Sequence, residues 1–484
     1  MGQQTIRFVL DEKTVEVDFR ESPGLKPSTT VLNYLRSLPA HKGVKEGCAE
    51  GDCGACTIVV AEPGDEGKMI YKALDSCLVF LPMIHGKQLI TVENLATREN
   101  RKQMLHPVQQ MLVDTNGTQC GYCTPGIIMS LFALYKNHPQ PSREIIEDAL
   151  TGNLCRCTGY QPILEAAQKV CAHEGRDHFS EKEKSTVKLL NTILENRETL
   201  EISASGQTYL KPFTLPEALK LRSLYPKAIL ISGSTDTALR QTKKKEFLSE
   251  ILDLSAVAEL KICREDLGQF VFGAGLSLEQ LKTFSSEKLP ALHKILGVFG
   301  SLQIRNLATI GGNVGSASPI GDLLPLLFVC DASLVLRSVS SERTLPIESF
   351  ITGYRQTQLR QDEVITEIRI PKTGAHTRID SFKVSKRKDL DISTVCGAFR
   401  VKTMDGMISE MRIAYGGMAE MTKRAMKAEK FLTGKKWTRA LVEEAMELLD
   451  EEFQPISDAR SGALFRKSVA KNLLLKFYVD TPQP

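Results

Sequence analysis

The placement of the cysteines restricts the fold of this chain more than any other feature of its sequence. Eight of the twelve cysteines lie in the first third of the 484 residues, and the other four are scattered. Clustered cysteines are more often metal ligands than disulfides in a reduced compartment, and the polar start MGQQTIRFVL is not typical of a secretory signal. The eight form two groups, Cys48, Cys53, Cys56 and Cys77, then Cys120, Cys123, Cys155 and Cys157. We therefore expect two metal-binding loops in this third of the chain.

The first group has the spacing C-x4-C-x2-C-x20-C, and its first three cysteines match the plant-type ferredoxin spacing for a [2Fe–2S] cluster. Gly47, Gly51 and Gly54 allow the positive φ angles of a tight loop, which can point backbone N–H groups at thiolates. The alternative is a zinc site, but zinc usually takes paired C-x2-C knuckles. The x4 gap and the glycines favour the cluster.

The second group combines C-x2-C at an expected helix start with C-x-C after 31 further residues. Cys155 and Cys157 are too close in sequence to form a disulfide with each other readily. Taken alone, this group fits zinc and iron–sulfur equally well. The neighbouring ferredoxin-like group favours a second [2Fe–2S] cluster, and two clusters in tandem indicate electron transfer. A zinc-stapled scaffold or a redox sensor is the non-enzymatic alternative.

Hydrophobic periodicity predicts a small sheet crossed by one helix in the first 90 or so residues, followed by four short helices. The sheet segment should contain a hairpin over 4–20, a helix over 28–38 capped by Ser28 or Thr29, and strands over 57–61 and 88–93. The helices should lie within 106–117, 124–137, 142–153 and 161–173, with Pro125 in a first turn and Ser142 as an N-cap. Residues 174–205 are polar and rich in lysine and glutamate, which is typical of a linker or ordered connector.

Mixed α/β patterns begin at about residue 206, and two stretches there contain glycine-rich turns. ILISGSTD (229–236) runs a buried strand into a turn whose backbone N–H groups could bind a pyrophosphate. ATIGGN (308–313) combines two glycines with an asparagine. Because neither stretch contains GxGxxG, a Rossmann dinucleotide site is not supported.

The motifs KEGCAEGDCGACT, QCGYCTPGIIMS and NLCRCTGYQPI together resemble the two-cluster N-terminal part of the molybdenum hydroxylases, a family that includes xanthine dehydrogenase, aldehyde oxidase and carbon monoxide dehydrogenase. The resemblance implies an α+β multidomain chain with a ferredoxin-like β-grasp domain, a four-helix [2Fe–2S] bundle, a two-lobed α/β FAD-binding domain of the vanillyl-alcohol-oxidase and CO-dehydrogenase-flavoprotein type, and a C-terminal α/β domain. The implied domains are 1–90, 91–175, 206–375 and 376–484, with a linker at 176–205.

The glycine-rich stretches resemble the FAD domain of the same family, and the resemblance assigns flavin contacts residue by residue. In the first stretch these are Leu230, Ile231, Gly233, Ser234, Thr235, Asp236 and Thr237. In the second they are Phe299, Thr309, Gly312, Asn313, Ser316 and Asp322, joined more loosely by Ile365 and Lys383. SFITGYRQT resembles the nicotinamide side of the flavin, which makes Tyr354 a candidate there. No catalytic acid or base is expected from this chain.

The resemblance also implies function and partners. It indicates an electron-transfer subunit of a xanthine dehydrogenase that carries two [2Fe–2S] clusters and FAD. Electrons from a purine, oxidised on a separate, large molybdopterin-binding subunit, would pass through these cofactors to NAD. A heterotetramer of two small and two large chains is expected, and an aldehyde oxidase or another N-heterocycle hydroxylase is the alternative. The net charge of +4 does not suggest nucleic acid, and no apolar run of about 18 residues suggests a membrane span. We therefore expect a cytoplasmic protein.

Overall fold

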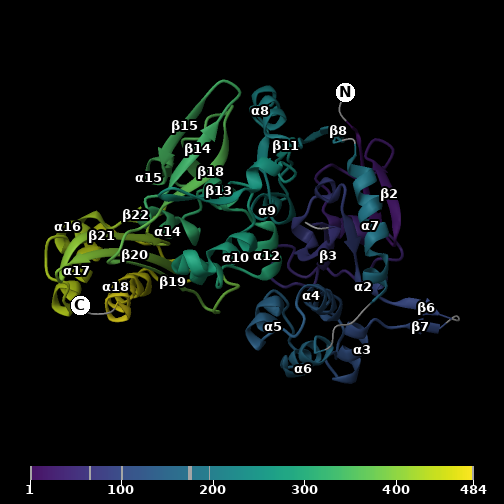
Figure 1. Cartoon of the computed structure of the whole chain (residues 1–484), viewed down its shortest axis with the longest axis horizontal. Coiled ribbons are helices and arrows are strands. Elements are labelled where there is room, and N and C mark those ends of the chain that lie inside the picture. Colours follow the sequence, from purple (N-terminus) through teal and green to yellow (C-terminus); the bar gives the residue numbers. More distant parts are fainter. Residues whose placement is uncertain (1–2, 65–66, 100–101, 173–176, 196, 482–484) are drawn as a thin grey trace. The chain divides into compact units, whose positions relative to one another are not determined.

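The computed structural model describes residues 3–64, 67–99, 102–172, 177–195 and 197–481. The chain forms two compact units, the first made of Met1–Leu221, Lys227–Val257 and Ser301–Ala308, and the second of Arg222–Pro226, Ala258–Gly300 and Thr309–Pro484 (Figure 1).

The first unit begins with a five-stranded sheet in the order β2-β1-β5-β3-β4. Its strands are β1 (Thr5–Leu10), β2 (Lys13–Asp18), β3 (Thr57–Pro63), β4 (Met69–Asp75) and β5 (Gln88–Ile90), and its helices are α1 (Val31–Ser37) and α2 (Val92–Leu95). The predicted hairpin is β1 and β2, paired antiparallel, while β1 pairs with β5 in parallel. This is the topology of a β-grasp sheet with one short helix, α1, packed on it.

Two sequence predictions for this sheet need correction. The N-cap of α1 is Thr30, not Ser28 or Thr29, because its hydroxyl accepts a hydrogen bond from the backbone N–H of Asn33. The strand predicted over 88–93 ends at Ile90, because the Asn94 side chain accepts a hydrogen bond from Thr91 N–H and starts a helical turn.

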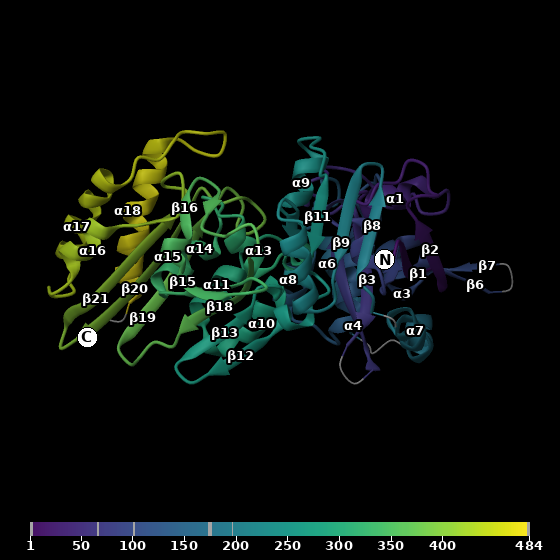
Figure 2. The same cartoon turned by 90° about the horizontal axis from the view of Figure 1, so that it is seen from above.

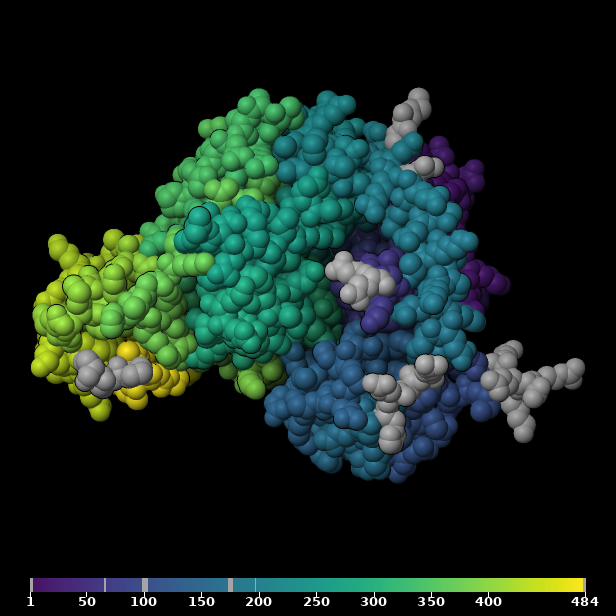
Figure 3. Space-filling model, viewed as in Figure 1, coloured from purple at the N-terminus to yellow at the C-terminus, as the bar shows by residue number. Residues whose placement is uncertain are grey.

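Four helices follow, as predicted. They are α3 (Pro107–Asp114), α4 (Thr124–Asn137), α5 (Arg143–Leu150) and α6 (Gln161–Val170), after a small hairpin of β6 (Thr97–Glu99) and β7 (Lys102–Met104). Pro125 lies in the first turn of α4 and Ser142 caps α5, both as expected. Helix α4 is apolar on most of its surface because it lies between the other helices and strands β3 and β4. The segment forms the blue surface at the bottom of the space-filling view (Figure 3).

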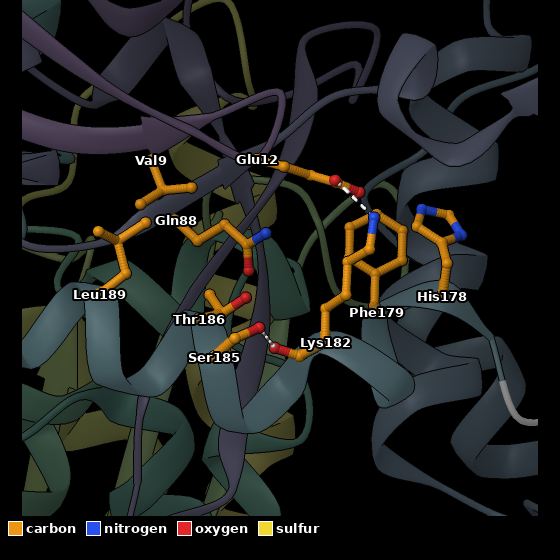
Figure 4. A pocket seen from close by; sticks show the side chains of 9 residues that line it. All are labelled: Val9, Glu12, Gln88, His178, Phe179, Lys182, Ser185, Thr186 and Leu189. Atoms are coloured by element: carbon orange, nitrogen blue, oxygen red, sulfur yellow. Dashed lines mark hydrogen bonds and ion pairs between the residues drawn. The ribbon is translucent and has the colours of Figure 1, made fainter.

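Part of the predicted linker is a long helix. Helix α7 (His178–Leu194) is polar, but it buries Phe179 and Leu190 and packs along β1 and β3. A pocket of about 240 Å³ lies between this helix and the sheet, and Figure 4 shows Gln88 and the ion pair of Glu12 with Lys182 around it. None of the residues predicted for cofactor sites lines this pocket.

The first unit also contains a four-stranded sheet in the order β10-β11-β9-β8. Its strands are β8 (Leu200–Ala204), β9 (Gln207–Lys211), β10 (Ile229–Ile231) and β11 (Glu250–Asp253), with helices α9 (Thr237–Thr242) and α12 (Leu302–Leu307) in the same unit. Helix α8 (Leu215–Leu224) runs across the division between the units. Strands β9, β11 and β10 are parallel, and β8 is the antiparallel edge. Regular α/β structure therefore starts at residue 200, before the predicted 206.

The second unit contains a five-stranded antiparallel sheet in the order β12-β13-β18-β14-β15. Its strands are β12 (Cys263–Asp266), β13 (Gln269–Gly273), β14 (Ser333–Arg337), β15 (Glu342–Pro346) and β18 (Val364–Pro371). The helices are α10 (Leu278–Lys288), α11 (Pro290–Leu296), α13 (Ile310–Gly315), α14 (Leu323–Val329) and α15 (Ile347–Phe350), and β16 (Ile351–Gly353) pairs with β17 (Gln356–Thr357).

The chain ends in a four-stranded antiparallel sheet covered on one face by helices, as Figure 2 shows in green and yellow. The strands are β19 (Thr377–Val384), β20 (Val395–Met404), β21 (Met407–Gly416) and β22 (Lys423–Arg424), and the helices are α16 (Met426–Leu432), α17 (Arg439–Glu452) and α18 (Ala463–Asp480). Phe399 stacks on Phe477 with ring centroids 5.2 Å apart in the core between them. In the described parts of the chain, no helix is both long and apolar enough to cross a membrane.

Candidate functional site

The first cysteine group lies at one end of the β-grasp sheet. Cys56 directly precedes β3, and Cys77 lies in the short 3₁₀ turn after β4, so the antiparallel pairing of these strands brings both thiols together. Their sulfurs are 3.4 Å apart. Cys48 and Cys53 form a second pair across the glycine-rich loop, where the N–H of Cys48 donates to Cys53 Sγ at 3.4 Å.

Backbone N–H groups of the loop point at the sulfurs, as an anionic cluster requires. The N–H groups of Glu50 and Asp52 donate to Cys48 Sγ at 3.4 and 3.3 Å. Gly51 and Gly54 have φ angles of 78° and 68°, as predicted. Gly47 has no positive φ and is needed for space instead, because a Cβ there would lie 2.7 Å from Cys53 Sγ.

The proximity of these thiols changes their acidity. The hydrogen bond with Cys53 lowers the pKa of Cys48 to about 5, and the same contact raises the pKa of Cys53. The contact with Cys77, followed by burial, raises the pKa of Cys56. The pKa of Cys77 is raised as well, so three of the four thiols resist ionisation, and holding all four as thiolates would need a cationic centre.

The second cysteine group lies on the surface of the helical segment. Cys123 precedes α4, while Cys155 and Cys157 lie in the loop before α6. Contact with Cys120 raises the pKa of the Cys157 thiol, and Cys123 has Cys155 as its hydrogen-bonding neighbour. Tyr160 positions this loop, because its hydroxyl accepts a hydrogen bond from Cys155 N–H at 2.8 Å. The structure therefore brings together all four predicted ligands, again as two pairs.

The pairwise arrangement distinguishes between a single metal ion and a two-iron cluster. A tetrahedral zinc site needs four ligands directed at one point, whereas a [2Fe–2S] cluster takes two thiolates on each of its irons. The two thiol pairs in each cysteine group fit a [2Fe–2S] cluster better than a single zinc ion. Cys48 and Cys53 would hold one iron and Cys56 and Cys77 the other.

The predicted flavin segment at 229–237 forms the end of β10 and the turn into α9. Leu230 is half-buried and Ile231 buried in the strand, and the turn carries Thr235, Asp236 and Thr237 at or near the surface. Gly233 has to be glycine, because a Cβ there would lie 1.7 Å from the carbonyl oxygen of Leu307. Ser234 adopts a φ of 57°, and its hydroxyl donates to the Leu78 carbonyl.

The predicted segment around 309–316 belongs to the second unit and forms α13. Thr309 caps the helix by accepting a hydrogen bond from Gly312 N–H at 3.1 Å. Gly312 and Gly315, which share one face, are exposed and leave the helix backbone open. The Oδ1 atom of Asn313 is buried and has no hydrogen-bond partner among the described residues. An open backbone beside an unsatisfied amide fits a polar ligand such as a flavin nucleotide.

Asp322 and Lys383 also lie together in the second unit. Lys383 Nζ is 3.0 Å from Asp322 Oδ2, and both side chains are buried. The hydroxyl of Ser393, which the sequence did not suggest, donates to Asp322 Oδ1 at 2.5 Å. Both carboxylate oxygens therefore have partners within the protein. Ile365 is buried beside Gly315, and Phe299 is half-buried in the turn after α11.

Three family models match the chain. A [2Fe–2S] binding domain covers residues 91–168 and contains the whole second cysteine group. An FAD binding domain in molybdopterin dehydrogenase covers 200–373, and a CO dehydrogenase flavoprotein C-terminal domain covers 380–481. The chain belongs to the molybdenum hydroxylase family, of which it is the iron–sulfur and flavin part.

Relatives within the molybdenum hydroxylases align over nearly the whole chain. Xanthine dehydrogenase of Emericella nidulans is 35% identical, and the alignment covers 98% of this chain and 38% of the relative. Aldehyde oxidase 2 of Mus musculus is 32% identical, and the alignment covers 94% of this chain and 38% of the relative. The chain thus spans about two-fifths of the length of such relatives.

Solved molybdenum hydroxylase structures resemble part of the chain. A chain of carbon monoxide dehydrogenase from Hydrogenophaga pseudoflava is 27% identical, with a TM-score of 0.53. The match covers 55% of this chain and 94% of the carbon monoxide dehydrogenase chain. A chain of quinoline 2-oxidoreductase from Pseudomonas putida 86 is 26% identical, with a TM-score of 0.52, and the match covers 56% of this chain and 95% of that one. FAD and [2Fe–2S] binding are therefore properties of this chain's domains.

Proposed function

We propose that this chain is the electron-transfer subunit of a molybdenum-dependent xanthine dehydrogenase. It would receive electrons from hypoxanthine or xanthine oxidised on a separate molybdopterin-binding subunit and deliver them to NAD. The clusters and FAD, when bound, supply the one-electron and hydride chemistry. The observation that supports this most strongly is the succession of two paired-cysteine loops and an FAD-binding region on one chain.

The protein's own residues contribute binding and positioning. The eight cysteines would hold the clusters as four thiol pairs, and the loop N–H groups would stabilise their negative charge. Gly312 and Asn313 would accommodate and bind the flavin nucleotide. Tyr354 is 61% exposed on the turn between β16 and β17, where it is free to contact a nicotinamide.

The neighbours support a separate partner chain. Because they are covered to 94% and 95% of their own length, a segment that matches a little over half of this chain stands as a separate chain in those two proteins. We propose a large molybdopterin-binding partner and a heterotetramer of two chains of each kind. Native mass spectrometry of the complex from its source would test this. A complex without a molybdopterin-binding chain would contradict it.

The second candidate is the equivalent part of an aldehyde oxidase, since aldehyde oxidase 2 of Mus musculus is 32% identical to this chain, against 35% for xanthine dehydrogenase of Emericella nidulans. Anaerobic titration with NADH distinguishes the two. For a xanthine dehydrogenase we expect NADH to bleach the flavin absorbance of the purified chain and then to reduce the clusters. If NADH leaves flavin and clusters oxidised while dithionite reduces both, the NAD assignment is wrong and the aldehyde oxidase reading is preferred.

A further inference from the structure

A buried polar cluster lies where the two cysteine loops of the first unit meet. It consists of Ser130 from α4, Asn153 from the loop before Cys155, and Gln303 from α12. Their exposed fractions are 2%, 3% and 0%. Burying three neutral polar side chains is unfavourable unless they hydrogen-bond each other or the backbone, so their contacts indicate what the cluster holds in place.

The Asn153 amide joins the two loops directly. Its Nδ2 donates to the carbonyl oxygen of Gly54 and to Thr57 Oγ1, each at 3.1 Å. Gly54 lies between Cys53 and Cys56, so this bond reaches into the first ligand loop from a residue two positions before Cys155. A side chain of the second loop thus fixes the backbone of the first.

The remaining contacts fix the orientation of that amide. Its Oδ1 accepts hydrogen bonds from Ser130 Oγ at 2.6 Å and from Gln303 Nε2 at 3.0 Å. Thr57 Oγ1 in turn donates to the Gly54 carbonyl at 2.7 Å, so it is an acceptor toward Asn153. Every donor and acceptor direction is therefore determined, and a flipped amide would place oxygen against oxygen.

The backbones of the loops are in contact at the same place. A Cβ on Gly54 would lie 2.2 Å from the carbonyl oxygen of Gly152, and one on Gly126 would lie 2.1 Å from that of Gly54. The N–H of Leu154 donates to the carbonyl of Cys53 at 3.1 Å. The loops can approach this closely only where glycine leaves room, and a small rotation of either loop would change the distance between the two thiol groups.

We propose that Asn153, oriented by Ser130 and Gln303, is a positioning residue that fixes the separation of the two iron–sulfur clusters. This inference rests on the proposed function, because both cysteine groups must hold clusters for their separation to matter. Electron transfer and magnetic interaction between paramagnetic centres both weaken steeply with distance. Asn153 would thus control transfer between the clusters without touching either of them.

The test is electron paramagnetic resonance of the full-length protein after dithionite reduction, combined with iron analysis. In the unaltered protein, we expect a splitting caused by interaction of the two reduced clusters. Asn153→Leu removes all four hydrogen bonds at similar volume, and we expect the splitting to narrow or vanish while the iron content is retained. Asn306→Leu is the matched control, because this amide lies on the same helix as Gln303 but donates to Ala73 O of β4 at 3.1 Å, outside both cysteine loops. The splitting of this variant should equal that of the unaltered protein.

The outcomes separate the two claims. If the unaltered protein binds no iron–sulfur clusters, the proposed function is wrong and the inference with it. If it shows interacting clusters and Asn153→Leu retains the same splitting, the inference alone is overturned. If Asn153→Leu does not fold, Ser130→Ala decides, because it removes one bond that orients Asn153: a reduced splitting with full iron supports the inference, and an unchanged one overturns it.

Discussion

At the scale of single residues, the proposed electron transfer depends on the cysteine pairs. Cys120 and Cys157 are both exposed on the helical segment, and their contact raises the pKa of the Cys157 thiol. A serine hydroxyl does not ionise at neutral pH and is a poor iron ligand. Replacing this one sulfur therefore tests the second cluster without disturbing the buried core.

For Cys157→Ser, we expect the iron content to fall from about four to about two per chain. In complex with the partner, purine-to-NAD activity should be lost, whereas NADH-to-dye activity should remain, because the dye can take electrons from the flavin. Cys263→Ser is the matched control, since Cys263 lies in β12 outside both groups. Equal loss of both activities would show that the second cysteine group is needed for folding and not specifically for electron transfer.

At the same scale, the sequence could predict the ligands but not what positions them. The spacing of the eight cysteines is a local signal, and the structure brings each group together. Asn153, Ser130 and Gln303 gave no such signal, because their hydrogen bonds join residues 23 to 173 positions apart. Ser393 was missed for the same reason. A residue whose role depends on long-range contacts has no pattern along the chain.

At the scale of secondary-structure elements, α13 offers a test of flavin binding. Asn313 Oδ1 is buried without a partner among the described residues, and an unsatisfied buried polar atom costs about 1–3 kcal/mol. Asn313→Leu should therefore leave the unfolding free energy of the flavin-free protein unchanged or higher, while it weakens FAD binding about tenfold, or about 1.4 kcal/mol. Equilibrium unfolding and flavin titration measure the two quantities.

The control for α13 is Asn137→Leu, which removes an amide that donates to Tyr71 O at 2.6 Å. It should lower stability by about 1 kcal/mol and leave FAD affinity unchanged. Unchanged FAD affinity in Asn313→Leu would contradict the placement of flavin at this helix.

Helix α7 depends on a buried charge. Asp177 caps the helix and binds His106 Nε2 at 3.1 Å and Lys136 Nζ at 2.8 Å, which ties α7 to α3 and α4. Burial opposes ionisation of Asp177, but the hydrogen bonds from His106 and Lys136 outweigh it and hold its pKa well below the usual range. A lowered pKa in the folded state stabilises the fold above the unfolded pKa of about 3.9, and this stabilisation is lost as pH falls toward the folded value.

Asp177→Asn should therefore destabilise the protein by about 3–5 kcal/mol at neutral pH, because Lys136 is left without its counter-charge. The difference from the unaltered protein should shrink below about pH 4. Urea unfolding over a pH series measures this. Glu147→Gln, which breaks an exposed pair with Arg143, should cost no more than about 1 kcal/mol. A difference for Asp177→Asn that stays constant with pH would show that its charge does not stabilise α7.

The elements themselves were predicted where periodicity was strong. The first hairpin and the four helices have clear two- and 3.6-residue patterns, and the structure confirms them. Helix α7 lies in the segment predicted to be a linker or ordered connector. Its helical pattern is weak because lysine and glutamate cover most of it and only Phe179 and Leu190 are buried. Strand β5 ended early because the hydrogen bond between Thr91 and Asn94 overrides the β propensity of TVE.

At the scale of the whole molecule, the chain divides into two compact units, and the four domains and linker implied by the family resemblance stay a prediction. The FAD-binding match at 200–373 contributes β8 to β11 to the first unit and β12 to β18 to the second. Gln303 belongs to the first unit, so the flavin region contributes directly to the cluster of side chains between the iron–sulfur loops. Contact patterns of this kind follow from tertiary packing and are not visible in local sequence.

The central claim is that one chain binds two [2Fe–2S] clusters and FAD. The most direct measurement is metal and flavin analysis of the purified full-length protein, together with its visible spectrum. We expect a red-brown protein with about four irons per chain, two for each cluster, and with flavin absorbance. A colourless protein that contains zinc at the eight cysteines would contradict it.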